Sequence, residues 1–287
     1  RRQRQMCIRD RLGEGQTTTR QLVGQGSIHY ANTFGKHNVD FLALAEVQDW
    51  KQNKFSAYAT DIPFVELPEL DFGNPAKSNP ISGGSDAKRS IGYVFRLKYD
   101  YDNKYLAEFT GRYDGSYKFA GNVSGKRWGF FPSGSVAWRI SKESFMEDLT
   151  FIDDLKVRAS AGLLGADAIT PYRFLSTYAY GDKVMIGGNS YPSMYTAAVP
   201  NATLTWENTL SYNVGFDFTM WNGLLGVDFD AFYNYTYDML TSMSSNAYPA
   251  SMGEYYNTYA NYNKMDAKGI DVVVSPVSYT HLTLPTT

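Results

Sequence analysis

The stretch IGYVFRLKYDYDNKYLAEFTGRYD, residues 91–114, decides the fold. Its side chains alternate in character from one residue to the next, and only the region around Asp102 and Asn103 interrupts the alternation. One set of alternate positions is mainly aromatic or aliphatic: Ile91, Tyr93, Phe95, Leu97, Tyr99, Tyr101, Tyr105, Ala107, Phe109, Gly111 and Tyr113. The other set carries most of the charges. A period of two is typical of a β-strand, so the stretch predicts an antiparallel hairpin with a tight turn.

The two predicted strands are long. Each alternation runs for about ten residues or more, whereas strands in soluble sheets usually have ~5 to 6 residues. A tilted strand that crosses a bilayer needs ~9 to 11 residues. In a soluble sandwich the apolar face would cover a core, and in an outer-membrane barrel it would meet lipid while the charged face lines a wet lumen. The hairpin alone fits both architectures.

The composition narrows the class of protein. Aromatic residues make up 16% of the 287 residues, and charged residues make up 20%, below the ~25% of average soluble domains. The net charge of -2 gives no indication of a nucleic-acid partner or an acidic substrate. No apolar run approaches the ~18 residues of a transmembrane helix, which excludes a helical membrane protein. A transmembrane barrel stays open because its strands leave the mean hydropathy low.

Both ends of the chain differ in character from the rest. Residues 1–12 and 276–287, which include RRQRQMCIRDR and VSYTHLTLPTT, resemble translated sequencing adaptors, so we expect residues 13–275 to be the native barrel segment. The single cysteine, Cys7, is then not native, and thiol catalysis, zinc thiolate sites and disulfides are not expected. We also expect both true ends of the protein, including any signal peptide, to lie outside this sequence.

Alternating runs predict nine strands, at about residues 27–34, 39–48, 91–101, 105–114, 135–140, 155–163, 210–219, 225–236 and 270–274. Short turns are predicted at residues 35–37, 102–104 and 221–223. A connection of about a dozen residues follows Ser141, which is expected to cap a helical turn that ends near Leu149. Long loops are predicted at residues 50–90, 115–130, 165–206 and 238–265.

The alternation of short and long connections decides between the two architectures. In an up-and-down meander every second connection lies at the same end, so the short turns share one end and the long loops share the other. This asymmetry is typical of bacterial outer-membrane barrels, and sandwiches and propellers give no reason for it. An open sheet in lipid would leave two unpaired edges, which a bilayer does not tolerate. The sequence therefore predicts an all-β, antiparallel transmembrane barrel of which this chain forms a part.

A run of motifs makes the interpretation more specific. Residues 112–145 read RYDGSYKFAGNVSGKRWGFFPSGSVAWRISKESF and contain R-x-D-G-S-x-x-F, W-G-x-F-P-S and W-R-I-S in this order. These motifs, with the segments at 155–165, 204–218 and 263–271, resemble the barrel of SusC/RagA-type TonB-dependent outer-membrane transporters. The resemblance covers about residues 27–275. Tyr117 departs from the second serine that is commoner in the family.

The resemblance implies a plugged barrel of ~22 strands in the outer membrane of a Gram-negative bacterium. It implies TonB-dependent import of glycans or peptides, without an enzymatic reaction or a cofactor. The implied partners are the TonB complex, a SusD-like surface lipoprotein, an oligosaccharide or peptide substrate and outer-membrane lipid. The plug and the TonB-contacting segment are expected to lie outside this sequence. The alternatives are a passive outer-membrane porin or adhesin-like barrel, and a soluble all-β carbohydrate-binding domain, which the strand length and the loop asymmetry oppose.

Two sets of residues are candidates for contact with a substrate. Aromatic rings in the predicted loops could stack on sugars, and these are Trp50, Trp128, Tyr178, Tyr180, Tyr191 and Tyr195. The alternative for this set is packing against one another or at the membrane interface. Charged residues of the polar face are expected to line the lumen as wall residues that pair with a plug: Arg96, Lys98, Glu108, Arg112, Arg139, Lys156, Arg158, Asp228 and Asp230.

Other kinds of site are not predicted. His29 and His37 stand apart, without the spacing of metal ligands. No P-loop, dinucleotide fingerprint or nucleophile elbow occurs in the sequence. We expect four motif residues to set the geometry of strands and loops rather than to bind a ligand: Asp114, Gly115, Trp128 and Pro132.

Overall fold

The computed structural model describes residues 11–62, 69–74, 81–123, 125–243 and 258–276. Of the two expected adaptor segments, residues 1–10 and 277–287 lie outside the described residues, whereas Arg11, Leu12 and Pro276 belong to strands. The described residues form strands, turns and three short 3₁₀ helices. None of the helices in this part of the chain is long and apolar enough to span a membrane.

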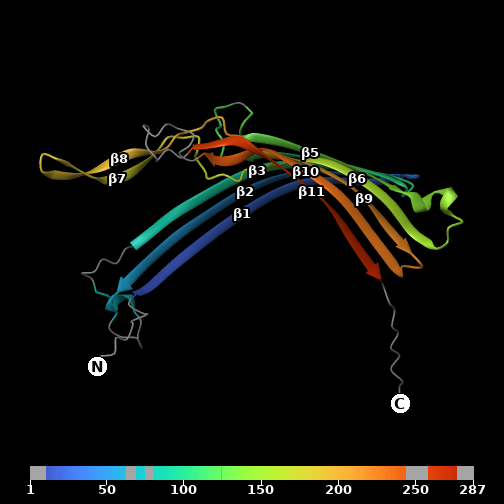
Figure 1. Ribbon diagram of the computed structural model, residues 1–287, viewed down its shortest axis with the longest axis horizontal. Coiled ribbons are helices and arrows are strands. Elements are labelled where there is room, and N and C mark those ends of the chain that lie inside the picture. Colours follow the sequence, from blue (N-terminus) through green and yellow to red (C-terminus); the bar gives the residue numbers. More distant parts are fainter. Residues whose placement is uncertain (1–10, 63–68, 75–80, 124, 244–257, 277–287) are drawn as a thin grey trace, which may run out of the picture. The chain divides into compact units, whose positions relative to one another are not determined.

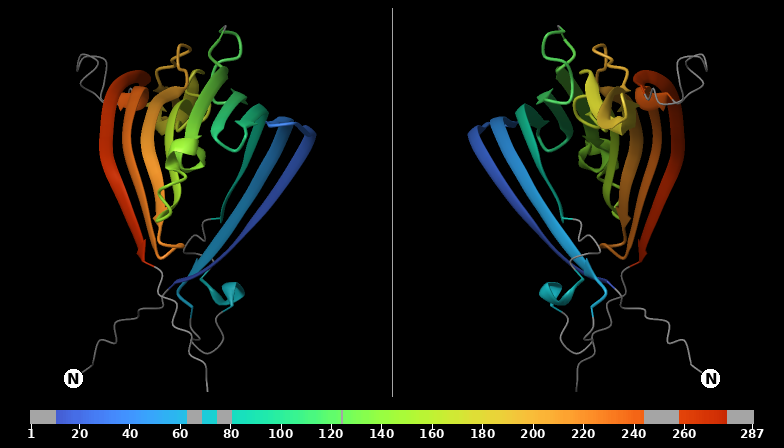
Figure 2. Two further views of the ribbon diagram at one scale, coloured as in Figure 1. Left: turned by 90° about the vertical axis from the view of Figure 1, so that its right-hand side faces the viewer. Right: turned by 90° about the vertical axis from the view of Figure 1, so that its left-hand side faces the viewer.

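Eleven strands lie in the described part of the chain. They are β1 (Arg11–Phe34), β2 (His37–Thr60), β3 (Ile81–Tyr101), β4 (Tyr105–Ser116), β5 (Trp128–Arg139), β6 (Ile152–Ala166), β7 (Thr177–Ile186), β8 (Asn189–Ala198), β9 (Glu207–Met220), β10 (Leu225–Met243) and β11 (Thr258–Pro276). Nine of them form one sheet in the order β1-β2-β3-β4-β5-β6-β9-β10-β11, and β7 pairs with β8 alone. The strands from β4 to β11 of the large sheet pair antiparallel and lie side by side in this order (Figure 2).

The structure comprises two compact units. The smaller unit holds residues 1–24 and 47–90. Within it, the carboxylate of Asp49 accepts a hydrogen bond of 3.0 Å from Arg89, and the ammonium group of Lys88 lies 4.4 Å from the ring centroid of Trp50. The larger unit holds residues 25–46 and 91–287 and contains the charge groups, the aromatic belts and the hairpin described below.

The two ends of the strands in the larger unit carry different connections (Figure 1). One end carries the tight turns that follow β1, β3 and β9, together with the short 3₁₀ helices η2 (Ile140–Lys142) and η3 (Ser144–Met146). The other end carries the longer connections after β4 and β6, including the β7–β8 hairpin. Asp102 and Asn103 have φ angles of 56° and 53°, as both central residues of a type I′ turn require. The predicted separation of short turns from long loops is confirmed.

The nine predicted strands are the nine strands of the large sheet, which confirms the all-β antiparallel fold. Several strands are longer than predicted. β2 extends to Thr60, β3 begins at Ile81 and β11 begins at Thr258, so parts of the predicted loops 50–90 and 238–265 are strand. These extensions do not alternate regularly between apolar and polar residues, so their strand structure is not predicted by a period of two.

Two local predictions are wrong. The predicted loop at 165–206 contains the β7–β8 hairpin. Ser141 does not cap a helix, because Arg139 is the N-cap residue of η2 and makes no side-chain cap bond. The Ser141 hydroxyl instead donates a hydrogen bond of 2.6 Å to the carboxylate of Asp154. That charged acceptor on β6 binds the hydroxyl in place of the backbone amides of the turn.

One face of the larger unit is a layer of aromatic and aliphatic side chains. The ring of Phe95 lies over Gly111, where an added Cβ would lie 2.1 Å from the ring. The same ring lies 5.7 Å from that of Phe109 and 6.3 Å from that of Phe130, measured between centroids. A glycine covered by a neighbouring aromatic ring is a common way to stabilise a strand that lacks a side chain.

In the larger unit, the fully buried apolar side chains lie at the end that carries the long connections, which we call the loop end. Phe119, Ile169 and Leu204 form a small cluster, with Trp206, Leu240 and Tyr259 packed against it. We call these six residues the loop core. The ring of Trp206 lies between Phe119 and Phe131, at centroid distances of 5.4 and 5.2 Å. The loop core therefore joins residues from the connections after β4, β6 and β8 to the ends of β10 and β11.

Candidate functional site

A chain of charges crosses the polar face of β6, β9 and β10. The guanidinium of Arg158 donates to Asp217 at 3.0 Å and to Asp230 at 2.7 Å, and Lys156 lies 2.9 Å from Asp217. Arg158 on β6 reaches Asp230 on β10 across Gly215, its register partner on β9. A Cβ at Gly215 would lie 2.6 Å from the carboxylate of Asp230. The glycine thus leaves the space that this pairing needs.

A second group of charges joins β1 to β4 on the same face. The imidazole of His29 lies 2.8 Å from the carboxylate of Asp40, and Arg96 approaches the other oxygen of Asp40 at 3.6 Å. Lys98 lies 3.5 Å from Glu108. All of these side chains are partly exposed, so each pair contributes little to stability and serves mainly to hold the side chains in place.

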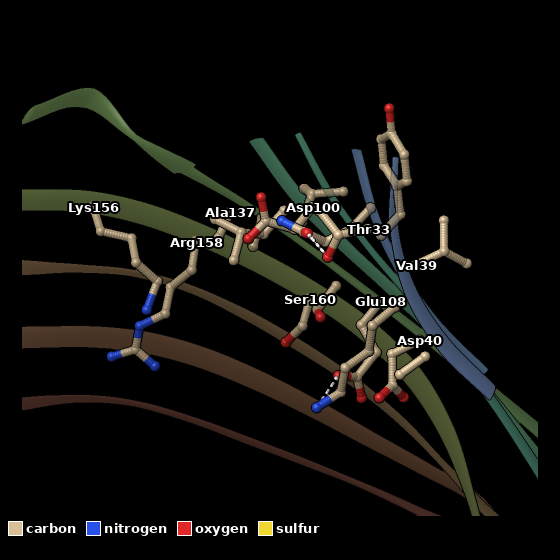
Figure 3. A pocket seen from close by; sticks show the side chains of 18 of the residues that line it. Thr33, Val39, Asp40, Asp100, Glu108, Ala137, Lys156, Arg158 and Ser160 are labelled. Carbon is tan, nitrogen blue, oxygen red and sulfur yellow. Dashed lines mark hydrogen bonds and ion pairs between the residues drawn. The ribbon is translucent and has the colours of Figure 1, made fainter. Parts of the chain in front are cut away.

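The two groups of charges border a trough of about 1030 Å³. Figure 3 shows that the side chains of Asp40, Glu108, Lys156 and Arg158 extend to the same side of the sheet. Between them lie small or neutral groups such as Ala137 and Ser160. The trough therefore combines paired charges at its borders with small apolar and neutral side chains between them.

Eight of the nine charges predicted for the lumen form ion pairs with residues of the sheet itself: Arg96, Lys98, Glu108, Arg112, Arg139, Lys156, Arg158 and Asp230. Asp228 is exposed and has no ion pair among the described residues. Pairing with a plug stays a prediction. Asp40 and Asp217 each pair with two basic side chains. Neither is among the residues predicted to line the lumen, although both stand on the polar face of alternating strands.

Two belts of aromatic rings cross the apolar face. The turn-end belt contains Tyr101, Tyr105 and Trp138, with centroid distances of 6.3 and 6.4 Å between successive rings. The loop-end belt contains Tyr93, Tyr113 and Trp128, in which Trp128 stacks on Tyr113 at 5.0 Å. Trp128 and Trp138 stand at the two ends of β5. Ten residues of a strand tilted by about 40° span about 26 Å, and outer-membrane barrels have an apolar band about 25 Å tall between two aromatic girdles.

Polar groups secure the turn-end belt. The Tyr105 hydroxyl donates to the carboxylate of Glu143 at 2.6 Å, and the Trp138 indole donates to it at 3.0 Å. Lys104 lies 3.3 Å from the same carboxylate. The hydrogen bond from Tyr105 has the largest effect on the pKa of Glu143, and that from Trp138 has the next largest. Both hold this pKa below its usual range. In the adjacent turns, the hydrogen bond from Lys36 to Asp102 raises the pKa of Lys36.

The structure separates the six predicted aromatic contact residues into three places. Trp50 lies within β2 beside Lys88, and Trp128 lies at the start of β5 in the loop-end belt. The prediction that these two tryptophans lie in loops is therefore wrong, because both belong to strands whose ends had been assigned to loops. The other four lie together on the β7–β8 hairpin: Tyr178, Tyr180, Tyr191 and Tyr195.

The β7–β8 hairpin presents its tyrosines to solvent. Tyr180 is 83% exposed and Tyr178 is 64% exposed. In the register of the hairpin, Tyr178 pairs with Thr196 and Tyr180 with Met194. Ala179 pairs with Tyr195 between them, so the hairpin has aromatic rings on both faces. Such rigid, amphipathic rings suit contact with sugars or with another protein.

Residues of the R-x-D-G-S-x-x-F motif hold the connections at the loop end together. Ser116 donates a hydrogen bond of 2.7 Å to the carboxylate of Asp167, and Lys118 lies 3.1 Å from the same group. Phe119 is fully buried in the loop core. Asn261 on β11 donates to the carbonyl of Thr205 at 2.9 Å. Neither Asp167 nor Asn261 was singled out by the sequence, because their partners stand about 50 residues away.

No group of three or more potential metal ligands occurs among the residues that the structure describes.

Comparison with protein families places this geometry among known proteins. A family model described as "TonB dependent receptor-like, beta-barrel" matches residues 8–284. The TonB-dependent receptor SusC of Bacteroides thetaiotaomicron is 29% identical over 219 residues, which cover 75% of this chain and 21% of SusC. The TonB-dependent receptor P39 of Formosa agariphila is 30% identical over 252 residues, which cover 86% of this chain and 23% of that protein.

Comparison with solved structures gives the same fold. The structure titled "RagAB peptide importer in the 'closed-closed' state" matches with a TM-score of 0.78 and 19% identity, over 95% of this chain and 29% of the matched chain. This chain therefore spans about a quarter of the length of the proteins that it matches.

Proposed function

Because this chain belongs to the TonB-dependent receptor β-barrel family, we propose that the whole protein imports a nutrient across the outer membrane of a Gram-negative bacterium. Proteins of this family lie in that membrane, and the nine-stranded sheet is part of the barrel wall. Import is active and draws its energy through the TonB complex. The end of the sheet with the long connections faces the cell exterior, as in other outer-membrane barrels.

The observation that carries this proposal is the contrast between the two faces of the larger unit. The apolar face has two aromatic belts separated by about the height of an outer-membrane apolar band. The polar face holds the trough and its paired charges. A wall with lipid on one side and a hydrated passage on the other accounts for both faces, whereas a soluble sheet would need a core against the apolar side.

The substrate is an oligosaccharide or a peptide, and a surface lipoprotein assists its capture. Two observations support this class: one relative is named SusC, and a protein of the same fold is titled a peptide importer. We assign the first contact with the substrate to Tyr178, Tyr180, Tyr191 and Tyr195, because the β7–β8 hairpin is the exposed aromatic surface at the exterior end.

The test is uptake of labelled oligosaccharides and peptides by cells that produce the full-length protein. Uptake should stop when TonB is deleted or when a protonophore removes the proton gradient. Replacement of both Tyr178 and Tyr180 by alanine should lower uptake at limiting substrate at least tenfold. Met185→Ala is the matched control, because it removes an equally exposed but non-aromatic side chain of the same hairpin. Uptake that persists without TonB would identify a passive porin instead.

A further inference from the structure

The connection between β5 and β6 carries more exposed apolar surface than a turn in water needs. Phe145 is 63% exposed, and Leu149 and Phe151 are also exposed. In the neighbouring β9–β10 turn, Trp221 and Leu224 are exposed as well. We call these five residues the turn-end patch.

The exposure of the turn-end patch does not result from an open sheet edge. β5, β6, β9 and β10 each have a hydrogen-bonded neighbour on both sides. By contrast, Val272 and Val274 are exposed on β11, the last strand of the sheet. The apolar side chains of the patch are thus exposed although each strand that flanks the two turns has a neighbour on both sides.

Hydrogen bonds join the two turns into one surface. The amide of Trp221 donates to the carbonyl of Phe151 at 2.9 Å. The amide of Gly223 donates to the carboxylate of Asp153 at 2.9 Å. These bonds hold the two turns next to each other at the short-turn end.

The turn-end patch lies next to the turn-end belt. The connection that carries Phe145, Leu149 and Phe151 begins beside this belt, where Tyr105 and Trp138 both donate to Glu143. The belt marks the level at which the apolar band ends, because tryptophan and tyrosine concentrate at that level in membrane proteins. Lys104 is already paired with Glu143, so that cation is not free to attract lipid headgroups. Burial of the exposed apolar area of the patch in lipid is the favourable contribution on which the inference rests.

We infer that the turn-end patch inserts into the interface of the periplasmic leaflet of the outer membrane, with its occupant being phospholipid rather than water or protein. Short turns of an outer-membrane barrel face the periplasm, which gives the leaflet. The inserted turns anchor this part of the wall at a fixed depth in the membrane. This role does not depend on the transported substrate or on TonB, so it goes beyond nutrient import.

Spin labels on the full-length protein in phosphatidylcholine vesicles test the inference. In a cysteine-free background, labels are placed through Phe145→Cys, Leu149→Cys and Leu224→Cys, with Asn222→Cys, at the tip of the β9–β10 turn, as the control. Oxygen, which concentrates in lipid, should relax the three patch labels more strongly than a water-soluble nickel chelate does, and the order should reverse at position 222. Patch labels that favour the chelate would overturn the inference, and so would labels that neither reagent reaches, because a protein would then cover the patch.

A second measurement leaves most of the patch unchanged. Brominated phospholipids should quench part of the tryptophan fluorescence, and Trp221→Phe should remove a part of the quenchable emission. Trp206→Phe is the control, because that ring is packed between Phe119 and Phe131. Equal quenching in the parent protein and Trp221→Phe would contradict insertion. Uptake is measured separately, so a result against insertion of the turn-end patch can be distinguished from a result against the import proposal.

Discussion

Replacement of Leu204 by alanine should loosen the outer loops without weakening the barrel wall. Leu204 is fully buried and forms the loop core with Phe119 and Ile169. Loss of a fully buried leucine side chain typically costs about 2 to 5 kcal/mol, including the cavity that remains. The loop core is small and lies at the end of the strands, where partial collapse is easy, so we expect about 2 to 4 kcal/mol.

The cost should appear as local opening rather than as global unfolding. The loop core joins connections whose backbone bonds lie outside the sheet ladders, such as Ser116 N–H to Arg127 C=O and Asn201 N–H to Arg173 C=O, both 3.0 Å long. At about 1.4 kcal/mol for each factor of ten, protection of these amides from hydrogen exchange should fall by about 30- to 700-fold. Amides in the middle of β4, β5 and β6 should exchange as before.

Hydrogen exchange followed by mass spectrometry on the full-length protein in micelles measures this difference. Leu175→Ala is the matched control, because Leu175 lies in the connection after β6, which also contributes Ile169 to the loop core, but is about half exposed, and its loss should change protection less than threefold. Equal loss of protection in loops and strands would show that the loops and the wall unfold as one unit. Unchanged protection in the loops of Leu204→Ala would show that the loop core does not hold them, and either result would refute the reasoning.

Two further predictions concern the wall and the turn end. Gly215→Ala should destabilise the protein in urea by about 1 to 3 kcal/mol, because its Cβ would lie 2.5 Å from the carbonyl oxygen of Phe229; Gly134→Ala, with its nearest neighbour at 3.8 Å, should be nearly neutral. Glu143 has a lowered pKa in the folded protein, so its stabilising effect is complete above the usual glutamate pKa of ~4.3 and is lost as the pH falls through the lower folded value. The urea midpoints of the parent protein and Glu143→Gln should therefore differ at pH 7 and converge as the pH falls below about 4; a gap that is constant with pH would show that the charge of Glu143 is not involved.

The central strands could be predicted from the sequence because each has to present two different faces. From Tyr105 to Tyr113 every second residue meets the apolar side, and this leaves a period of two in the sequence. The second half of β2, residues 49–60, has no such period. There the structure is determined by the hydrogen bonds of the backbone to neighbouring strands. The side chains of one segment do not indicate these bonds.

The sequence does contain a signal for the β7–β8 hairpin, at its turn. Gly187 and Gly188 have φ angles of 58° and 83° and join Ile186 to its register partner Asn189. Two consecutive glycines between runs rich in tyrosine, valine and threonine are typical of a two-residue hairpin turn. Pro192 weakened the signal, because proline is tolerated mainly in edge strands. In a two-stranded hairpin both strands are edges, so the proline is compatible with β8.

The charge network could be predicted in its face but not in its pairs. Alternation places Lys156, Arg158 and Asp230 on the polar side. Which cation pairs with which anion depends on the register of neighbouring strands. β6 pairs with β9, although about 40 residues that include the β7–β8 hairpin separate the two strands in the sequence. No local feature near Arg158 indicates that its partner lies 72 residues away.

The pairing of charges within the wall bears on where a substrate is recognised. Arg158 already has two carboxylate partners, and Lys98 has one. A cation that is satisfied in this way gains little by exchanging its partner for a passing solute, because it loses about as much interaction as it forms. For the import that we propose, this favours the exposed tyrosines of the β7–β8 hairpin over Arg158 and Lys98 as the place where the substrate is first recognised.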